Sequence, residues 1–533
     1  MNKTKAAIKN VADNIFSIMF LLSVIFFAFM RTIDRNPDTD SYFLIENGRY
    51  IFEYKVVPTT NPWSIVSGLG IIIQQPLCSL LNYLGYCAFG LKNLWILAAI
   101  ENMFLLFAVY QLCSLYTKET SRKLLATGLF ELILTSNNYI TTRPYQITMC
   151  LSIIEIICLY KYFYISQKHK KDTIKLFVQC CLLTLLQVNY QASFTIMMFI
   201  WILCFVVFDV RKFKSFRNPL YKKEIKTKLK LGVMLYACMG LASLMNPNGI
   251  NGPLYLFKST SAISLLQNSI AETKSPALTS ATGFLILTIV ICLIVLYKID
   301  KIDTYLLYMS LGTSVMAATA LRNLWTMYIP LIILYVILMG KASKYYNKKC
   351  QERLQELQKK NENDLDQIMS ECHKQSITGQ KKENNGYGKI LIIFFFIGLY
   401  SWLLIGKSTN DSKVYKEYAF EDAVAYLDTL NKDDITLYTT FNTGAYMEFS
   451  GYQIFLDARP ELYSDVITKG PNLLQDWYEA NTYKTDIYEF INKYGFTHFV
   501  VGKNDVFDVY LKYHSGYQKI CENESFVLYE RNE

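Results

Sequence analysis

Two aspartates, Asp38 and Asp40, lie one residue apart just after the first apolar run of the chain. A positioned carboxylate can accept the proton of a hydroxyl group as that hydroxyl attacks an electrophilic carbon. In an extended backbone, residues 38 and 40 point to the same side, so the two carboxylates could share one substrate or one divalent metal ion. The structural alternative is that Asp40 only caps the helix expected to follow, since aspartate is a preferred N-cap residue.

The composition of the chain indicates a membrane protein. Hydrophobic residues make up 52% of its 533 residues and charged residues only 18%, and the 40 Tyr and 33 Phe suit lipid-facing helices and interfacial belts. The net charge of +10 does not indicate a nucleic-acid partner, because the Lys and Arg residues cluster between apolar runs. The 13 Cys and four His show neither zinc-site spacing nor a disulfide framework.

The apolar runs predict an α-helical polytopic protein with about eleven membrane spans. Each run is near the roughly 20 residues that a helix needs to cross about 30 Å of hydrocarbon. The expected spans are 14–30, 94–115, 123–139, 146–164, 174–189, 192–209, 229–245, 282–298, 303–320, 324–341 and 389–406.

The basic loops between these runs predict the orientation. The run 69–89 is also apolar, but counting it as a span would place the loop 211–230, which is rich in Lys and Arg, on the outside. We therefore expect 69–89 to lie on the outer surface of the cell membrane, with the N-terminus and the later basic loops in the cytoplasm.

This topology divides the chain into four parts. Residues 1–341 form the transmembrane domain, and its first outer loop, 31–92, contains the two aspartates and surface helices. A charged cytoplasmic linker, 342–388, precedes the last span, 389–406, and residues 407–533 are expected to form an extracytoplasmic α/β domain. In that domain we expect helices at 421–430, 473–480 and 486–494, and strands at 435–440, 452–457 and 497–501.

Polar residues suited to binding or catalysis gather at the predicted outer face. None of them was used to choose the orientation, so their convergence suggests a site on that side. Each cation could instead be an interfacial residue that reaches lipid headgroups, and Asn246-Pro247-Asn248-Gly249 is typical of a helix-ending turn. The candidate residues are Asp38, Asp40, Arg143, Asn189, Gln191, Glu272, Lys274 and Arg322.

The order of these motifs resembles the C-type glycosyltransferase (GT-C) superfamily, in particular an uncharacterised bacterial branch. Members of that branch have Asp-x-Asp-x-aromatic-aromatic-His-x-x-x-Gly in the first outer loop, which is similar to Asp38, Asp40, Tyr42, Phe43 and Gly48. The resemblance spans most of the chain. Further matches are Pro58-x-x-Asn61-Pro62-Trp63-Ser64, Arg143-Pro144, Asn189, Asn246-Pro247-x-Gly249, Ile270-x-Glu272, Arg322-Asn323, Phe441-Asn442-Thr443-Gly444-Ala445-Tyr446 and Asp457-Ala458-Arg459-Pro460-Glu461-Leu462-Tyr463.

Three positions where the branch often has histidine differ in this chain: Leu44, Gln74 and Gln191. If those histidines bind a metal or transfer a proton, that function is missing or reassigned here. Gln191 could still form a hydrogen bond with a sugar hydroxyl, whereas Leu44 could not. The differences leave open a metal-free enzyme, a changed substrate or a non-catalytic relative.

The resemblance implies transfer of a sugar from a polyprenyl phosphate to a glycan, lipid or protein acceptor at the outer membrane face. Asp40, or else Asp38, would be the general base, and Arg143, Lys274 or Arg322 would stabilise the leaving phosphate. A divalent metal at the two aspartates stays open, and no other cofactor is indicated. The remaining substrate-binding candidates are Asn189, Gln191 and Glu272.

Two alternatives belong to other functional classes. A flippase or transporter for lipid-linked saccharides would use the same basic groups, and polar residues in the middle of spans would favour it. Glu101, Glu131 and Glu155 lie within expected spans, although each could equally serve helix packing. The other alternative is an assembly scaffold whose outer domain recruits partners.

The predicted topology places Ser121 and Ser412 on opposite sides of the membrane. A misplaced Lys or Arg costs about 2.5 to 3.5 kcal/mol at the centre of a span on insertion scales, so the basic loops determine the orientation. Cysteines introduced at the two positions should react with a membrane-impermeant thiol reagent from opposite sides. Reaction of both from one side would contradict the eleven-span topology.

Overall fold

The computed structural model divides into two compact units, residues 1–333 with 415–533, and residues 334–414. The predicted last span, 389–406, and most of the predicted span 282–298 lie outside the described residues. Of the second unit, the structure describes the part of α13 (Trp325–Lys360) that follows residue 333. The described residues are 2–35, 37–207, 218–262, 274–277, single positions between 283 and 293, 302–360 and 419–532.

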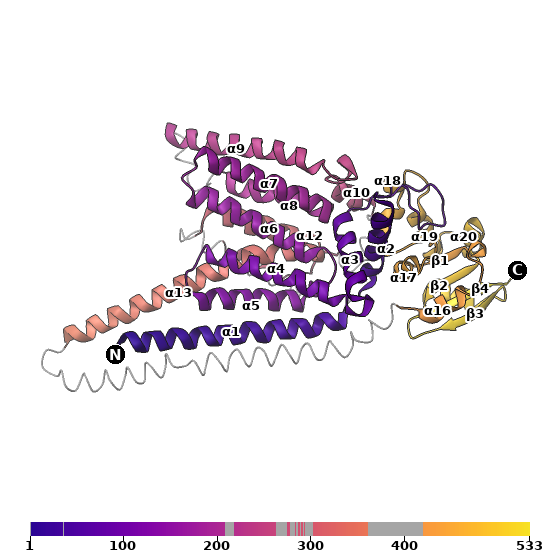
Figure 1. The fold of residues 1–533 in the computed structure, drawn as a ribbon, viewed down its shortest axis with the longest axis horizontal. Coiled ribbons are helices and arrows are strands. Elements are labelled where there is room, and N and C mark those ends of the chain that lie inside the picture. The colour runs from indigo at the N-terminus through magenta and orange to yellow at the C-terminus, as the bar shows by residue number, and fades with distance from the viewer. Residues whose placement is uncertain are drawn as a thin grey trace. The chain divides into compact units, whose positions relative to one another are not determined.

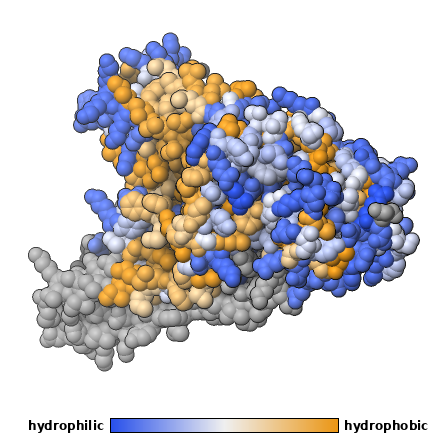
Figure 2. Space-filling model, turned by 45° about the vertical axis from the view of Figure 1, so that its right-hand side comes forward, coloured by the Kyte–Doolittle hydropathy of each residue, from blue (hydrophilic) through white to orange (hydrophobic). Residues whose placement is uncertain are grey.

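A helix bundle makes up most of the first unit. Its long helices lie side by side (Figure 1), and large apolar side chains point outward from them. Phe26, Met103, Phe107 and Val233, for example, are between 64% and 70% exposed. Figure 2 shows this apolar surface over the bundle, as expected where helices face lipid. The helices are α1 (Asn2–Arg35), α4 (Trp95–Ser114), α5 (Thr120–Ser136), α6 (Tyr145–Tyr160), α7 (Lys170–Tyr190), α8 (Thr195–Val206), α9 (Pro219–Ser243) and α12 (Thr304–Thr319).

Four segments of the described chain are helical, long and apolar enough to cross a membrane: Ile15–Ile33, Leu91–Ser114, Tyr145–Ile165 and Lys170–Tyr190. They confirm the membrane protein that the composition predicts. The predicted number of about eleven spans stays a prediction, because several bundle helices are shorter. The helices α5, α8 and α12 contain 17, 12 and 16 residues.

Two shorter helices, α2 (Thr39–Tyr54) and α3 (Pro76–Phe89), pack against each other. The apolar run 69–89 is helical only from Pro76, because proline is favoured at the first helical position, where its missing N–H group is not needed. With 14 residues, α3 is too short to span a bilayer. Its predicted place on the outer surface stays a prediction.

The C-terminal residues form a small α/β domain, as the alternation of helix and strand patterns predicts. Its four-stranded sheet has the order β1-β2-β4-β3, with β1 parallel to β2 and the other pairs antiparallel. The strands are β1 (Leu437–Thr439), β2 (His498–Gly502), β3 (Tyr517–Glu522) and β4 (Phe526–Arg531). The helices are α16 (Glu421–Leu427), α17 (Gly444–Phe449), α18 (Asp465–Thr468), α19 (Leu473–Asn481), α20 (Ile487–Tyr494) and α21 (Val506–Tyr513), and η10 (Pro460–Tyr463) is a 3₁₀ turn.

One predicted strand of this domain, 452–457, is wrong as a sheet strand. Its Ile454 pairs instead with the first loop, donating its N–H to the Trp63 carbonyl (2.7 Å) and accepting from the Ile65 N–H (3.1 Å). The extended apolar run therefore satisfies its backbone groups with a partner about 390 residues away in sequence, which the local pattern does not reveal. The hairpin of β3 and β4 and helix α21 were not predicted.

The C-terminal domain and the first loop share their hydrophobic cores. Trp63, Leu69 and Ile71 are buried in one cluster with Tyr438 and Phe455 of the domain. In a second cluster, residues 42–44 of α2 are buried together with residues of α16, β1 and β4. The domain is therefore packed directly onto α2 and the loop that follows it.

Close packing of α2 on α3 depends on Gly48, the last residue of the Asp-x-Asp motif. A Cβ atom at this position would lie only 2.1 Å from the carbonyl oxygen of Ser79. Gly48→Ala should lower the melting temperature of the detergent-purified protein, because overpacking costs about 1–3 kcal/mol. Gly312→Ala in α12 is the matched control.

A Cβ atom at Gly312 meets open space, and alanine favours a helix over glycine by about 1 kcal/mol. The control variant should therefore melt no lower than the wild type. Equal melting temperatures for Gly48→Ala and the wild type would mean that the α2–α3 contact does not need a glycine.

Candidate active site

A cavity of about 140 Å³ lies where α2, the bundle and the C-terminal domain meet within the first unit. The bundle contributes residues just before α6, just after α7 and in the 3₁₀ turn η8 (Leu321–Asn323). Further lining comes from residues 72–75, from helix α10 (Tyr255–Ala262) and from residues 458–462 of the C-terminal domain. Seven segments that are separate in the sequence thus form one polar-lined cavity.

Asp38, and not Asp40, caps α2. The Asp38 carboxylate accepts hydrogen bonds from the backbone N–H of Ser41 (3.0 Å) and from its hydroxyl (2.8 Å), while the Ser41 hydroxyl accepts from the Asp38 N–H (3.0 Å). This reciprocal capping box starts the helix at Thr39, so the backbone is extended at Asp38 but helical at Asp40, and the extended stretch assumed through both residues is wrong. Asp40 lies in the first helical turn and lines the cavity.

Arg143 nevertheless brings the two aspartates together. Its Nε lies 2.6 Å from Asp38 Oδ2 and 3.2 Å from Asp40 Oδ2. The three side chains are between 18% and 25% exposed. A cation between two carboxylates compensates the repulsion between their like charges. Arg143 thus holds Asp40 in place instead of standing free for a ligand.

A divalent metal does not fit this arrangement of the two aspartates. The guanidinium group of Arg143 already faces the carboxylate oxygens that a metal would need. Among the described residues, no group of three His, Cys, Asp or Glu side chains could hold a metal ion. We therefore assign no step of the chemistry to a metal at Asp38 and Asp40.

The three positions where the related branch often has histidine, Leu44, Gln74 and Gln191, all line the cavity. The amide oxygen of Gln191 accepts a hydrogen bond from the Thr148 hydroxyl (2.8 Å), which leaves its amide N–H groups to face a ligand. The buried amide oxygen of Gln74 has no hydrogen-bond partner among the described residues. The sequence differences are thus concentrated in the site and replace imidazoles by carboxamides and one apolar group.

Arg322 is the cation in the cavity whose side chain is available. No hydrogen bond or ion pair engages its half-buried guanidinium within the described part of the chain. Lys274 is exposed and outside the cavity lining, although its carbonyl accepts a hydrogen bond from the Leu321 N–H (3.1 Å). Glu272 lies outside the described residues.

Asn189 does not line the cavity. Its amide nitrogen donates to the carbonyls of Leu185 (2.9 Å) and Met245 (3.0 Å) and so connects the end of α7 to the turn after α9. In that turn, the Asn246 amide donates to the carbonyls of Ser243 and Gly249, both at 2.8 Å. Both asparagines therefore have structural contacts here, as expected for a helix-ending turn.

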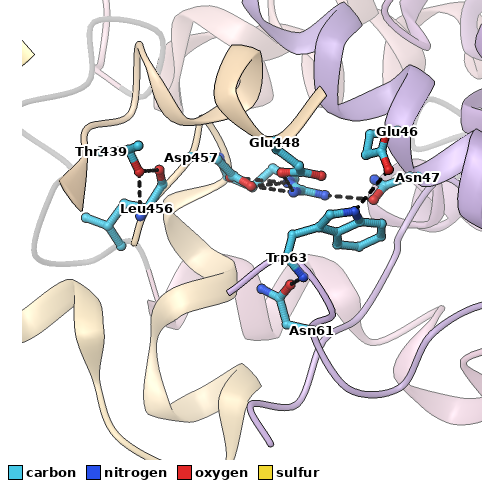
Figure 3. Close-up of polar contacts among 9 residues, drawn as sticks. Glu46, Asn47, Asn61, Trp63, Thr439, Glu448, Leu456 and Asp457 are labelled. Atoms are coloured by element: carbon cyan, nitrogen blue, oxygen red, sulfur yellow. Dashed lines mark hydrogen bonds and ion pairs between the residues drawn. The ribbon is translucent and has the colours of Figure 1, made fainter. Parts of the chain in front are cut away.

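The wall of the cavity is fixed by a buried ion network around Arg459. Its guanidinium donates to Asp457, with Nε at 3.0 Å from Oδ2, to Glu448 Oε2 (2.7 Å) and to Asn47 Oδ1 of α2 (3.1 Å). It also lies over the Phe43 ring, 4.5 Å from the centroid. In Figure 3, Asp457 and Glu448 of the C-terminal domain face Asn47 of α2. The network therefore joins the domain to the helix that contains Asp40.

Two equally buried carboxyl groups share this one arginine, and its contacts decide which of them keeps its charge. Asp457 and Glu448 are 0% exposed and Arg459 is 8% exposed. Burial raises the pKa of Glu448 well above its ordinary value, and the Arg459 charge only partly opposes this. Burial also acts on Asp457, but the Arg459 guanidinium holds the pKa of that carboxyl below its usual value. We infer a neutral network of Arg459 cation, Asp457 anion and protonated Glu448.

Glu461 adds a second carboxyl group to the cavity lining, from η10 of the C-terminal domain. The Tyr255 hydroxyl of α10 donates to its Oε1 at 2.9 Å. Burial raises the pKa of Glu461, while the Tyr255 hydrogen bond and the positive charge of Arg322 act in the opposite direction. The cavity therefore has Asp40 on α2 and a second carboxyl on the C-terminal domain.

The acids within the bundle lie away from this cavity. Glu101 accepts a hydrogen bond from the Tyr190 hydroxyl, and Glu131 accepts one from the Asn102 amide, both at 2.6 Å. Glu155 is buried and has no hydrogen-bond partner among the described residues. None of the three lines the cavity, and the first two connect neighbouring helices. They therefore add no support for a transporter.

Sequence reasoning placed Asp40, Arg143, Gln191 and Arg322 in one site, and the structure brings them together. It did not include Asn47, Tyr255, Arg459 or Glu461 among the site residues, although all four line the cavity. Arg459 and Glu461 lie in a motif that the resemblance had singled out. However, nothing in the local sequence shows that this motif packs against α2.

Solved structures that are similar to this chain are known. ArnT from Cupriavidus metallidurans matches in the apo state (TM-score 0.52, 13% identity) and bound to undecaprenyl phosphate (TM-score 0.51, 11% identity). Each match covers 96% of this chain and 97% of that chain. The Archaeoglobus fulgidus oligosaccharyltransferase gives a TM-score of 0.49 at 12% identity, over 96% of this chain and 74% of that chain. No family model and no curated protein matches the sequence.

The chain therefore has the GT-C fold, which confirms the fold that the motif resemblance implies. At these identities the match concerns the architecture: a helix bundle followed by a small C-terminal domain. The roles of individual residues rest on the cavity of this chain.

The neutral Arg459 network predicts that two conservative substitutions differ strongly in their effect on the stability of the protein. Glu448→Gln keeps the shape and the neutral charge of the protonated acid, so it should change the melting temperature little at pH 5. Asp457→Asn leaves the buried arginine without its anion and should destabilise by about 3–5 kcal/mol. Melting temperatures of the two variants and the wild type should be compared between pH 5 and pH 9.

The pH dependence gives a second test of the same assignment. Because the pKa of folded Glu448 is raised, its contribution to stability is complete below the ordinary value of 4.5 and is lost as the pH rises through the raised value. Glu448→Gln cannot ionise, so its melting temperature should increase relative to the wild type as the pH rises. A constant difference over this range would show that Glu448 is charged throughout.

Proposed function

We propose that this chain is a membrane glycosyltransferase that transfers a sugar from a polyprenyl phosphate to a glycan, lipid or protein acceptor at the outer face of the membrane. The observation that carries the proposal is that the Asp40 carboxylate and the available guanidinium of Arg322 line the same cavity. Glycosyl transfer from a phosphate needs a proton acceptor and a group that stabilises the leaving anion. The crystal structure of ArnT with undecaprenyl phosphate supports a lipid of this class as the donor.

Asp40 acts as the general base in this proposal. The acceptor hydroxyl attacks the anomeric carbon of the sugar and forms the new C–O bond, while its proton passes to an Asp40 carboxylate oxygen. The bond between the anomeric carbon and the phosphate oxygen breaks, and its electron pair stays on the phosphate. Arg322 stabilises the negative charge of that leaving phosphate by charge-assisted hydrogen bonds.

Asp38 and Arg143 position Asp40. The Asp38 carboxylate is engaged by the helix N-terminus, by the Ser41 hydroxyl and by Arg143, so less of it is available for a substrate proton. Arg143 contacts both acids through Nε, at 2.6 Å and 3.2 Å. Asp40 makes the longer of these two contacts and lines the cavity, which favours it over Asp38 as the base.

Asp40→Asn should reduce sugar transfer by roughly 10²- to 10⁴-fold, the usual contribution of general base catalysis, with donor binding nearly unchanged. The assay is transfer of radiolabelled sugar from polyprenyl phosphate by the purified protein. Asp38→Asn is the matched control, because asparagine caps a helix as well as aspartate does. Its loss should be smaller.

The two variants also distinguish the other interpretations. Full activity of Asp40→Asn with loss in Asp38→Asn would move the base to Asp38. Full activity of both variants would mean that neither Asp38 nor Asp40 takes part in catalysis. Donor binding by the wild type without any transfer would favour a flippase or an assembly scaffold.

Arg322→Ala should weaken binding of the polyprenyl-phosphate donor about 10- to 100-fold, because hydrogen bonds to charged groups contribute about 1.5–3 kcal/mol. Lys274→Ala should leave the affinity unchanged, since that side chain is exposed and does not line the cavity. Fluorescence titration with a labelled lipid measures both. Unchanged affinity of the Arg322→Ala variant would favour the alternative that Arg322 only contacts lipid headgroups.

A further inference from the structure

Besides Asp40, the described cavity lining contains the carboxyl group of Glu461, to which the proposed mechanism gives no role. It belongs to the motif 457–463, in which Asp457 and Arg459 serve the buried ion network. The Tyr255 hydroxyl donates to one Glu461 oxygen, Oε1, at 2.9 Å. Because a carboxylate has about four acceptor positions, this bond leaves most of its hydrogen-bonding capacity unused.

Glu461 is held in place through the backbone that precedes it and through its side chain. On its N-terminal side lies Arg459, two residues before Glu461, and Asp457, Glu448 and Asn47 anchor this arginine. On the other side, η10 packs against α10, which contributes the Tyr255 hydroxyl. A polar group fixed in this way at a cavity wall is suited to recognise a ligand, because little side-chain entropy is lost on binding.

The place of Glu461 relative to Arg322 identifies the part of the donor that it would contact. Arg322 lines the same cavity and its charge acts on the Glu461 carboxyl, yet the two side chains form no ion pair within the described residues. A ligand in the cavity can therefore contact both groups. In a polyprenyl-phosphate donor whose phosphate binds Arg322, the sugar is joined to that phosphate through one oxygen atom, so it is the part of the donor that Glu461 could contact.

We propose that Glu461 accepts a hydrogen bond from a hydroxyl group of the donor sugar, so that the C-terminal domain takes part in donor selection. The inference rests on the proposed function, since it assumes a polyprenyl-phosphate sugar in the cavity. The carboxamides of Gln74 and Gln191 line the same space and suit hydroxyl groups as well. Glu461 thus distinguishes the sugar-bearing lipid from the bare lipid phosphate.

The test compares two lipids on the purified full-length protein: undecaprenyl phosphate, and the tightest-binding member of a panel of polyprenyl-phosphate hexoses. Glu461→Ala should weaken binding of the hexose lipid about tenfold and change binding of undecaprenyl phosphate less than twofold. Glu461→Gln keeps an acceptor oxygen and should recover part of the loss. Tyr255→Phe, which removes only the hydrogen bond to Glu461, should give a smaller loss for the hexose lipid.

Unaltered affinity of Glu461→Ala for the hexose lipid would overturn the inference. An equal loss for both lipids would also overturn it, because it would make Glu461 a structural residue of the cavity wall. These outcomes leave the proposed function intact, since the wild type binds both lipids in each case. If the wild type binds neither lipid, the proposed function itself fails, and the inference fails with it.

Discussion

Arg459 makes the contact on which the candidate site depends. Its buried guanidinium connects two acids of the C-terminal domain with Asn47 of α2 and packs on Phe43 of the same helix. Burying a charge is costly unless it is paired and hydrogen-bonded, and here the partners come from both sides of the interface. The C-terminal domain is therefore held in one orientation on α2, and the cavity wall formed by residues 458–462 follows from that orientation.

A second arginine organises the opposite wall. Arg143 lies between Asp38 and Asp40, where the sequence left room for a divalent metal, and it comes from the segment just before α6. Because Asp38 caps α2 and also orients this arginine, Asp40 is the acid left to face the cavity. Arg143 and Arg459 are thus engaged in contacts that hold the structure together. Among the described residues of the cavity, the guanidinium group of Arg322 stays available to an anionic ligand.

Local patterns predicted the parts of this structure that depend on local physics. Apolar runs indicated helices such as α4 and α7, and the first-loop motif indicated α2, because hydrophobic periodicity and capping act over a few residues. The sequence also contains a local signal that Asp38 and not Asp40 is the cap residue, because Ser41 follows Asp38 by three residues, the spacing of a capping box. The contacts that form the site span 105 residues from Asp38 to Arg143 and 412 from Asn47 to Arg459. No local pattern encodes such pairs, so the roles of Arg143, Arg459 and Glu461 needed the fold.

The central claim is that the cavity is the binding site of a polyprenyl-phosphate sugar. A structure of the purified protein with such a donor bound tests it most directly. The account predicts the phosphate at the Arg322 guanidinium and the anomeric carbon facing the Asp40 carboxylate. A donor bound elsewhere on the protein, with no part of it near Asp40, would contradict the account.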